Sequence, residues 1–362
     1  MKKILAILAV VVVVLIAIFY LRGTTETAPV SRLDLDRPLV VGLVSWPGYA
    51  GGITANLGFQ ENAEGIFYKK YGLPVKFVLI EDIDARGKAF AKGGPDGVDV
   101  VWSTVDFWAN ELPAYIQGGL HPKAFLQVDW SRGGDAIVAD QSVKTIEDLR
   151  GKKIALVQYT PSHWFLESAF KDSKLTEPEK EQLRKNLIFT QDVPSARAAF
   201  TAGQVDAAAV WEPDVNQALK RSGSHVLLSS RDMPNLIADV MVAQQEFIDA
   251  HPKTMEAFVR GWLDGVAEAK SNPDLAAQLL VDNEPLFRDL GIPATKDSLA
   301  WVYWPDLADN ASMFGLNGKP AVFDALFSNA AQTWKNLGAI DTIVSPDDAK
   351  DISVLRRVYG QQ

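Results

Sequence analysis

Cysteine is absent from the 362 residues of this chain. The absence of thiols excludes disulfides, a cysteine nucleophile, cysteine-ligated zinc and iron–sulfur clusters. Histidine is scarce, and no two of the four histidines have the helical spacing of paired metal ligands: His121, His163, His225 and His251. We therefore expect neither a metal site nor a cofactor.

Signatures of catalysis and of nucleic-acid binding are missing as well. The chain contains no phosphate-binding loop of the G-x-x-x-x-G-K type and no legible Ser–His–Asp set. Its 45 acidic residues outnumber its 36 lysines and arginines, which gives a net charge of −9. Because phosphate backbones bind basic surfaces, we expect no nucleic-acid partner. The sequence favours a binding protein over an enzyme.

An apolar segment near the start of the chain predicts export. Residues 4–21 follow Lys2 and Lys3, and a helix of this length spans about 27 Å, close to the thickness of the hydrocarbon core. The two lysines keep the N-terminus in the cytoplasm. Residues 1–22 are either a cleaved signal peptide or an uncleaved anchor, and the weak cleavage sites that follow favour the anchor. A tether over 23–37 then places the rest in the periplasm or on the extracellular face of the cytoplasmic membrane.

From residue 38 onward, short apolar strands alternate with amphipathic helices, a pattern typical of α/β lobes with largely parallel sheets. A chain of this length is too long for one ordinary core and suits two lobes. The expected strands cover residues 39–44, 75–80, 97–102, 152–157, 187–190, 205–210 and 236–243. The expected helices include one that ends near residue 71 and others over 103–112, 192–202, 246–270, 274–290 and 322–337.

The order of these segments predicts that one lobe interrupts the other. Residues 38–135 form the first part of lobe 1, residues 136–238 form lobe 2, and residues 239–362 return to lobe 1 and add C-terminal helices. Crossovers near 133–137 and 238–240 would act as two hinges. Ligands bind beyond the carboxyl ends of strands in such sheets, so we expect the site in the cleft between the lobes.

The strongest local signal is a strand that runs into Thr160 and a helix. Thr160 suits the N-cap and the following proline suits the first helical position. The free backbone N–H groups of Ser162 and His163, with the helix dipole behind them, would bind an acidic group such as a sulfonate, carboxylate or phosphate. The alternative is that Thr160 only caps a surface helix.

Two further segments place aromatic residues at strand ends. Trp211 and Glu212 follow a strand of small residues, so the indole would line the pocket and the carboxylate would accept from a ligand donor. The alternative is a core tryptophan with an exposed glutamate. Trp46 and Tyr49 lie on a glycine-rich loop after the first strand and would stack on a ligand or cover a cation. Packing within the loop is the alternative.

Polar residues at the remaining strand ends and crossovers complete the candidate site. Ser103 and Thr104 offer hydroxyls and amides at a helix start after the third strand. Asp135 and Asp239 stand at the two crossovers, where a carboxylate would neutralise an ammonium group on the ligand. Hydrogen bonds within the hinges are the alternative for both aspartates.

Four segments carry a resemblance to a known family: residues 146–155 (IEDLRGKKIA), 160–164 (TPSHW), 203–213 with GQVDA and WEP, and 247–252 (FIDAHP). Together they resemble the taurine, aliphatic sulfonate and nitrate class of periplasmic solute-binding proteins, which includes binders of thiamine pyrimidine precursors. The resemblance implies a two-lobed Venus-flytrap fold, an ABC importer as partner, and a ligand acidic group at the turn over 160–163. The aromatic loop at Trp46 and Tyr49 suits a heteroaromatic ring or a quaternary ammonium group.

These observations predict the solute-binding component of an ABC importer. We expect a monomer that captures a small anionic or zwitterionic organic molecule (sulfonate-like, amino-acid-like or pyrimidine-like) and delivers it to a membrane permease, with the N-terminal helix in the membrane. A tethered ligand sensor or interaction module is one alternative. An enzyme resembling the thiamine pyrimidine synthases is another, which the export segment and the lack of cysteine disfavour.

Overall fold

The computed structural model describes residues 33–360. Residues from Leu33 onward form one compact unit. Every helix in this described part is too short or too polar to cross a membrane. The anchor predicted over residues 4–21 lies outside the described residues, as does most of the tether.

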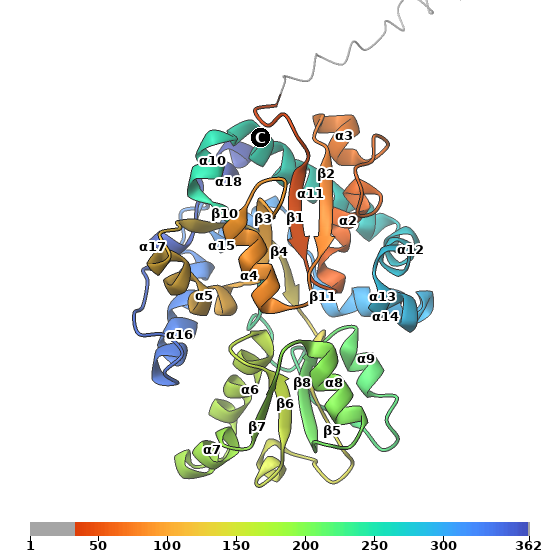
Figure 1. Ribbon diagram of the computed structural model, residues 1–362, viewed down its shortest axis with the longest axis vertical. Coiled ribbons are helices and arrows are strands. Elements are labelled where there is room, and N and C mark those ends of the chain that lie inside the picture. The colour runs from red at the N-terminus through yellow and green to blue at the C-terminus, as the bar shows by residue number, and fades with distance from the viewer. Residues whose placement is uncertain (1–32, 361–362) are drawn as a thin grey trace, which may run out of the picture. The chain divides into compact units, whose positions relative to one another are not determined.

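The first of two sheets has six strands in the order β11-β4-β10-β3-β1-β2 (Figure 1). Their bounds are β1 Leu39–Leu43, β2 Val75–Leu79, β3 Val100–Thr104, β4 Pro122–Ser131, β10 Ala238–Gln244 and β11 Val302–Tyr303. Strand β1 is parallel to β2 and β3, whereas β10 is antiparallel to β3 and β4. All residues of β1 and β3 are buried, which explains the continuous apolar sequence of β1.

The second sheet has five strands in the order β7-β6-β8-β5-β9. Their bounds are β5 Asp135–Ala139, β6 Ile154–Val157, β7 Leu187–Thr190, β8 Ala207–Trp211 and β9 His225–Ser229. Strand β6 is parallel to β7 and β8, and β5 is antiparallel to β8 and β9. Both sheets are therefore mixed, and the expectation of largely parallel sheets is wrong for the strands next to the crossovers.

The chain passes between the sheets twice. It leaves the first sheet after β4 and enters the second at β5, and it returns between β9 and β10. The second sheet is thus inserted between two parts of the first, in the connectivity that the sequence predicts. The exact lobe limits, at residues 135 and 238, stay a prediction.

Helices surround both sheets (Figure 1). Around the second sheet they are α6 Pro161–Asp172, α7 Glu177–Arg184, α8 Val193–Thr201 and α9 Asp214–Ala218, after the short 3₁₀ turn η2 Ile146–Leu149. The first sheet is accompanied by η1 Pro47–Tyr49, α2 Ala50–Asn56, α3 Ile66–Tyr71, α4 Ile83–Lys92 and α5 Val105–Gln117. After the return come α10 Gln245–Ala250, α11 Pro252–Ser271, α12 Pro273–Asn283, α13 Pro285–Leu290, α14 Ile292–Ser298, η3 Leu299–Trp301, α15 Leu307–Met313, α16 Val322–Asn336, α17 Pro346–Ala349 and α18 Ser353–Tyr359.

Several predicted elements are divided for local reasons. The helix expected up to residue 71 is broken at Leu57, which adopts left-handed backbone angles. The helix expected over 246–270 is broken at His251, because the proline that follows disfavours helical angles in the residue before it. Thr104 caps α5 as predicted, since its Oγ1 accepts a bond of 3.2 Å from the N–H of Phe107.

The largest side chains of the hydrophobic core are mostly aromatic. Trp262 of α11 and Trp334 of α16 are fully buried, as their positions on apolar helix stripes predict.

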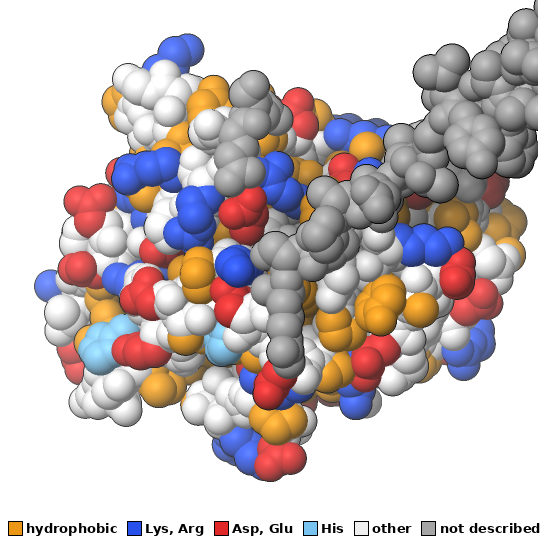
Figure 2. Space-filling view, turned by 90° about the horizontal axis from the view of Figure 1, so that it is seen from above, with side chains coloured by type: hydrophobic (Ala, Val, Ile, Leu, Met, Phe, Trp, Pro, Cys, Tyr) orange, Lys and Arg blue, Asp and Glu red, His pale blue; other side chains and the backbone are white. Residues whose placement is uncertain are grey.

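The surface differs from this core in character. On the face shown in Figure 2, the acidic and basic side chains of the described residues are interspersed rather than gathered by sign.

Candidate ligand-binding site

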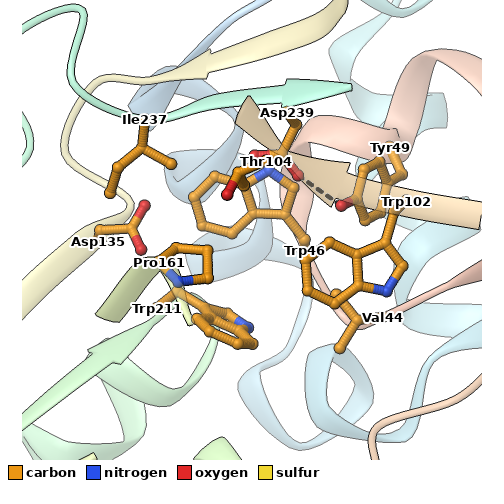
Figure 3. A pocket seen from close by; sticks show the side chains of 10 residues that line it. All are labelled: Val44, Trp46, Tyr49, Trp102, Thr104, Asp135, Pro161, Trp211, Ile237 and Asp239. Atoms are coloured by element: carbon orange, nitrogen blue, oxygen red, sulfur yellow. Dashed lines mark hydrogen bonds between the residues drawn. The ribbon is translucent and has the colours of Figure 1, made fainter. Parts of the chain in front are cut away.

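A small pocket lies at the carboxyl ends of β1, β3 and β8 and next to both crossovers (Figure 3). Its cavity volume is about 10 Å³, room for roughly one water molecule. Its lining combines side chains of both sheets and is mostly aromatic or acidic: Val44, Trp46, Tyr49, Trp102, Thr104, Asp135, Pro161, Trp211, Ile237 and Asp239. A ligand here would touch both lobes at once.

Four aromatic side chains form the walls of this pocket. Trp46 and Tyr49 come from the loop after β1, Trp102 from β3 and Trp211 from β8. The rings of Trp102 and Trp211 meet edge to face across the two sheets, with centroids 6.2 Å apart. The indole of Trp46 packs against Gly134 of the first crossover, where any Cβ would come within 2.4 Å of the ring. A glycine is therefore required at that point of contact.

Two carboxylates line the pocket and a third lies beside them. Asp135 begins β5 and Asp239 lies in β10, where its register partner in β4 is Asp129. The hydroxyl of Tyr49 donates to Asp239 Oδ2 at 2.5 Å, and Trp46 Nε1 donates to Asp129 Oδ2 at 2.8 Å. Figure 3 shows the Asp135 carboxylate directed toward the space between the rings.

Burial makes ionisation of these carboxyl groups unfavourable. Loss of hydration raises the pKa of Asp135 to about 7. Burial also raises the pKa of Asp129 and, well above its ordinary value, that of Asp239, and the charge of Asp129 adds to the effect on Asp239. The pKa of Tyr49 is raised by burial and by the same two carboxylates. The protonated, neutral form of these acids is therefore favoured.

Two more buried acidic side chains lie near the pocket without lining it. Asp106 lies in the first turn of α5, and burial raises its pKa to about 8. Glu212 follows β8, is fully buried, and accepts bonds of 3.2 Å from the Asn216 amide. Burial raises the pKa of Glu212 to about 8 as well. The alternative of an exposed glutamate after Trp211 is therefore wrong, although Glu212 does not line the pocket.

The predicted helix start lies next to the pocket but reaches it only through Pro161. Thr160 occupies the N-cap position of α6, yet its hydroxyl donates to the Val157 carbonyl at 2.8 Å rather than capping the helix. Ser162 Oγ is buried without a hydrogen-bond partner. His163 Nδ1 accepts from the Tyr159 N–H at 3.1 Å. Thr160, Ser162 and His163 are thus not brought into the lining.

Six of the eleven predicted site residues do meet in the lining: Trp46, Tyr49, Thr104, Asp135, Trp211 and Asp239. Ser103 faces away, because its hydroxyl donates to Glu111 Oε2 at 2.9 Å. Sequence reasoning missed Trp102, although it lies two residues from Thr104 on the same strand and therefore on the same face. Asp129 was missed because its strand was not predicted.

Comparisons with known proteins agree with this architecture. A family model described as "NMT1/THI5 like" matches residues 133–276. The taurine-binding periplasmic protein of Escherichia coli is 30% identical over 264 residues, which are 66% of this chain and 77% of that protein. Two solved structures share the fold throughout. The periplasmic aliphatic sulphonate binding protein SsuA of Escherichia coli has a TM-score of 0.66 at 18% identity and covers 90% of this chain and 100% of its own.

The second structure is the ligand-binding component of an ABC-type import system from Staphylococcus aureus. It has a TM-score of 0.67 at 13% identity and covers 89% of this chain and 99% of its own. These likenesses confirm the two-lobed periplasmic-binding-protein fold that the sequence predicts. With an inserted second lobe, two crossovers and a relative at 30% identity, this chain belongs to the family of taurine- and aliphatic sulfonate-binding periplasmic proteins.

Proposed function

We propose that this chain is the extracytoplasmic solute-binding component of an ABC importer. The observation that carries the proposal is the pocket that residues of both sheets line together. Because Trp211 comes from the second sheet and Trp102 from the first, a bound solute would hold the two lobes against each other. Closure around a ligand is how a binding protein would signal occupancy to a permease.

The proposed ligand is a small organic molecule, zwitterionic or anionic, of the sulfonate-like, amino-acid-like or pyrimidine-like kind. The cavity of about 10 Å³ is smaller than any such solute, so the lobes would part to admit it and then close on it. We assign contact roles to the six residues in the lining. The helix start at Thr160, Ser162 and His163 would contact the solute only on closure. The backbone N–H groups of that start would approach an acidic end of the solute when the lobes close.

We further propose that the chain captures its ligand without changing it chemically. The relatives named above are described as binding proteins or ligand-binding components, and the proposal extends that role to this chain. The linkers between β4 and β5 and between β9 and β10 would act as hinges. We place the protein in the periplasm or on the outer face of the cytoplasmic membrane, anchored by residues 4–21, as a monomer that contacts a permease.

A ligand screen with the full-length chain in detergent tests this proposal. Thermal unfolding is followed with sulfonates, amino acids, betaines, pyrimidines and nitrate at several concentrations. A true solute at about 100 times its Kd stabilises the protein by about 2.7 kcal/mol, a shift of a few degrees at this chain length. A shift that saturates with one solute class supports the receptor function. If no solute shifts the transition, the proposal is wrong and a tethered interaction module becomes the better explanation.

A further inference from the structure

Acidic side chains without a basic partner surround the pocket. Five acidic side chains at or behind the lining are each at most 4% exposed: Asp106, Asp129, Asp135, Glu212 and Asp239. They are close enough to interact, since the charges of Asp129, Asp135 and Asp106 all act on Asp239. Five acids from separate elements converge on one small space.

No lysine or arginine among the described residues forms an ion pair with these acids. Asp129 and Asp239 accept from Trp46 and Tyr49, and Glu212 accepts from an asparagine. The nearby guanidinium of Arg86 pairs instead with Glu111, which lies behind Ser103. Buried carboxylates are normally paired with a cation or kept protonated, because an isolated buried charge costs several kcal/mol.

Several oxygens of these acids have no partner at all. Asp129 Oδ1 is buried without a hydrogen bond, and both carboxylate oxygens of Asp106 are in the same condition. Buried polar atoms are nearly always satisfied in folded proteins, so unsatisfied atoms next to a pocket point to a missing donor. A ligand rich in N–H groups would supply such donors.

The walls of the pocket suit a positive charge for an independent reason. The rings of Trp46, Trp211 and Tyr49 line the space in Figure 3. The ring of Trp102 lines it too and already holds the Arg86 guanidinium, 4.8 Å from its centroid. Aromatic faces carry negative potential and attract ammonium and guanidinium groups, most strongly when water is excluded. These four side chains are at most 6% exposed, so a cation between them would be largely dehydrated.

We infer that the pocket binds a compact organic cation, an ammonium- or guanidinium-type group, and that this group is the part of the solute which the protein selects. The inference rests on the proposed function and deepens it. A zwitterion satisfies both the proposed function and this inference. Its cationic end would enter the acidic aromatic pocket while its acidic end faces the start of α6. A simple anion does not, since it would meet buried carboxylates and aromatic faces.

Matched solutes separate charge from shape in isothermal titration calorimetry of the full-length chain at pH 8. Guanidinium and urea are both small and planar but differ in charge, and methylammonium and methanesulfonate place opposite charges on one methyl group. Taurine carries both charges. We expect saturable binding of a cation or of taurine, and binding of urea and methanesulfonate that is at least tenfold weaker.

A variant of Asp135 tests whether its carboxylate is the partner of the bound cation. Asp135→Asn keeps the shape of a group that projects into the pocket, and should weaken cation binding by on the order of 100-fold, as the loss of a buried partner charge does. Asp289→Asn, an exposed change of equal charge in α13, is the control and should leave binding unchanged. The thermal transition of each unliganded variant verifies that it folds.

The outcomes separate the inference from the proposed function. Binding of cations that is lost only in Asp135→Asn supports both. Binding of methanesulfonate without binding of any cation leaves a solute receptor but overturns the cation pocket. Equal affinity for guanidinium and urea overturns it too, because shape rather than charge would then be recognised. No binding of any solute here or in the wider screen removes the proposed function itself.

Discussion

Asp129 of β4 and Asp239 of β10 are register partners in adjacent antiparallel strands, so two carboxyl groups lie side by side on one face of the first sheet. Such partners have Cβ atoms about 5 Å apart, and like charges there repel. Each accepts a single bond from an aromatic side chain of the same loop, Asp129 from Trp46 and Asp239 from Tyr49. The loop after β1 therefore holds the acidic pair in place, and a positive ligand would relieve its repulsion.

The unliganded protein should lose stability as the pH rises. Burial raises the pKa values of Asp106 and Glu212 to about 8 and that of Asp135 to about 7. A carboxyl group whose pKa is higher in the folded state stabilises the fold fully below its unfolded pKa of about 4. That contribution disappears as the pH rises through the folded pKa. We expect the thermal transition to fall between pH 5 and pH 8.5, measured by circular dichroism at constant ionic strength.

Several charged and titratable groups face the buried acids of the pocket, and substitutions among them serve as controls for the pH dependence. They are Asp106, Asp129, Asp135, Glu212 and Asp239, together with Tyr49, Arg86 and Asp214. Asp106→Asn removes one raised pKa without touching the lining, so the slope of stability against pH should become shallower. A bound cation should oppose the decline and bind more tightly at high pH, with release of protons. A transition temperature independent of pH would contradict this prediction.

The sequence predicted the part of the site that depends on strand ends. Trp46, Trp211 and Asp239 were found because apolar strands, glycine-rich turns and crossovers are legible locally. Asp129 was not found, because β4 contains Gln127 and Asp129 among its buried residues and so lacks a continuous apolar pattern. Whether a side chain faces the pocket also depends on distant partners. Ser103 bonds to Glu111 of the following helix and is lost to the site.

Gly48→Ala should disrupt the acidic pair and its loop. A Cβ at this position would lie 1.6 Å from Asp129 Oδ2 and 2.4 Å from Trp46 Nε1, the two atoms that share a hydrogen bond. Both side chains are buried. We expect a loss of about 1–3 kcal/mol in the free energy of unfolding, with solute affinity at least tenfold weaker. Denaturant titration and calorimetry measure the two effects.

Gly87→Ala is the matched control for that substitution. Gly87 lies in α4, and the nearest atom to an added Cβ is Tyr115 Oη at 3.5 Å, an ordinary contact. Alanine in the middle of a helix should stabilise by about 0.5–1 kcal/mol relative to glycine. If Gly48→Ala and Gly87→Ala behave alike, the steric argument for the loop is wrong.

Ser162→Ala tests the start of α6 as the position of the solute's acidic end. Ser162 Oγ is buried without a partner, so its removal should leave the unliganded protein equally stable or slightly more stable. A solute with an acidic end should bind about 10–100-fold more weakly, the loss expected for a hydrogen bond to a charged group. A purely cationic solute should be unaffected. Ser168→Ala, further along the same helix, serves as control, and equal losses in both variants would argue against a contact at the helix start.

Trp334 should couple the two lobes. This residue of α16 donates from Nε1 to the Asp106 carbonyl at 2.7 Å, and its ring lies within 5.6 to 6.1 Å of the rings of Tyr159, His163 and Trp164. Those three rings belong to the second lobe, at the start of α6. Trp334→Ala should cost about 3–5 kcal/mol of stability and, because it loosens a contact between lobes, should also weaken solute binding.

Trp262→Ala separates these two effects. Trp262 is equally buried but packs against Phe77 and Phe258 within the first lobe. Its loss should lower the denaturation midpoint by a similar amount, while solute affinity, measured far below the transition, stays near that of the unaltered protein. An affinity loss confined to Trp334→Ala would mean that the contact favours the closed arrangement. If both variants bind the solute equally well, α16 contributes to stability alone and closure depends on the pocket residues themselves.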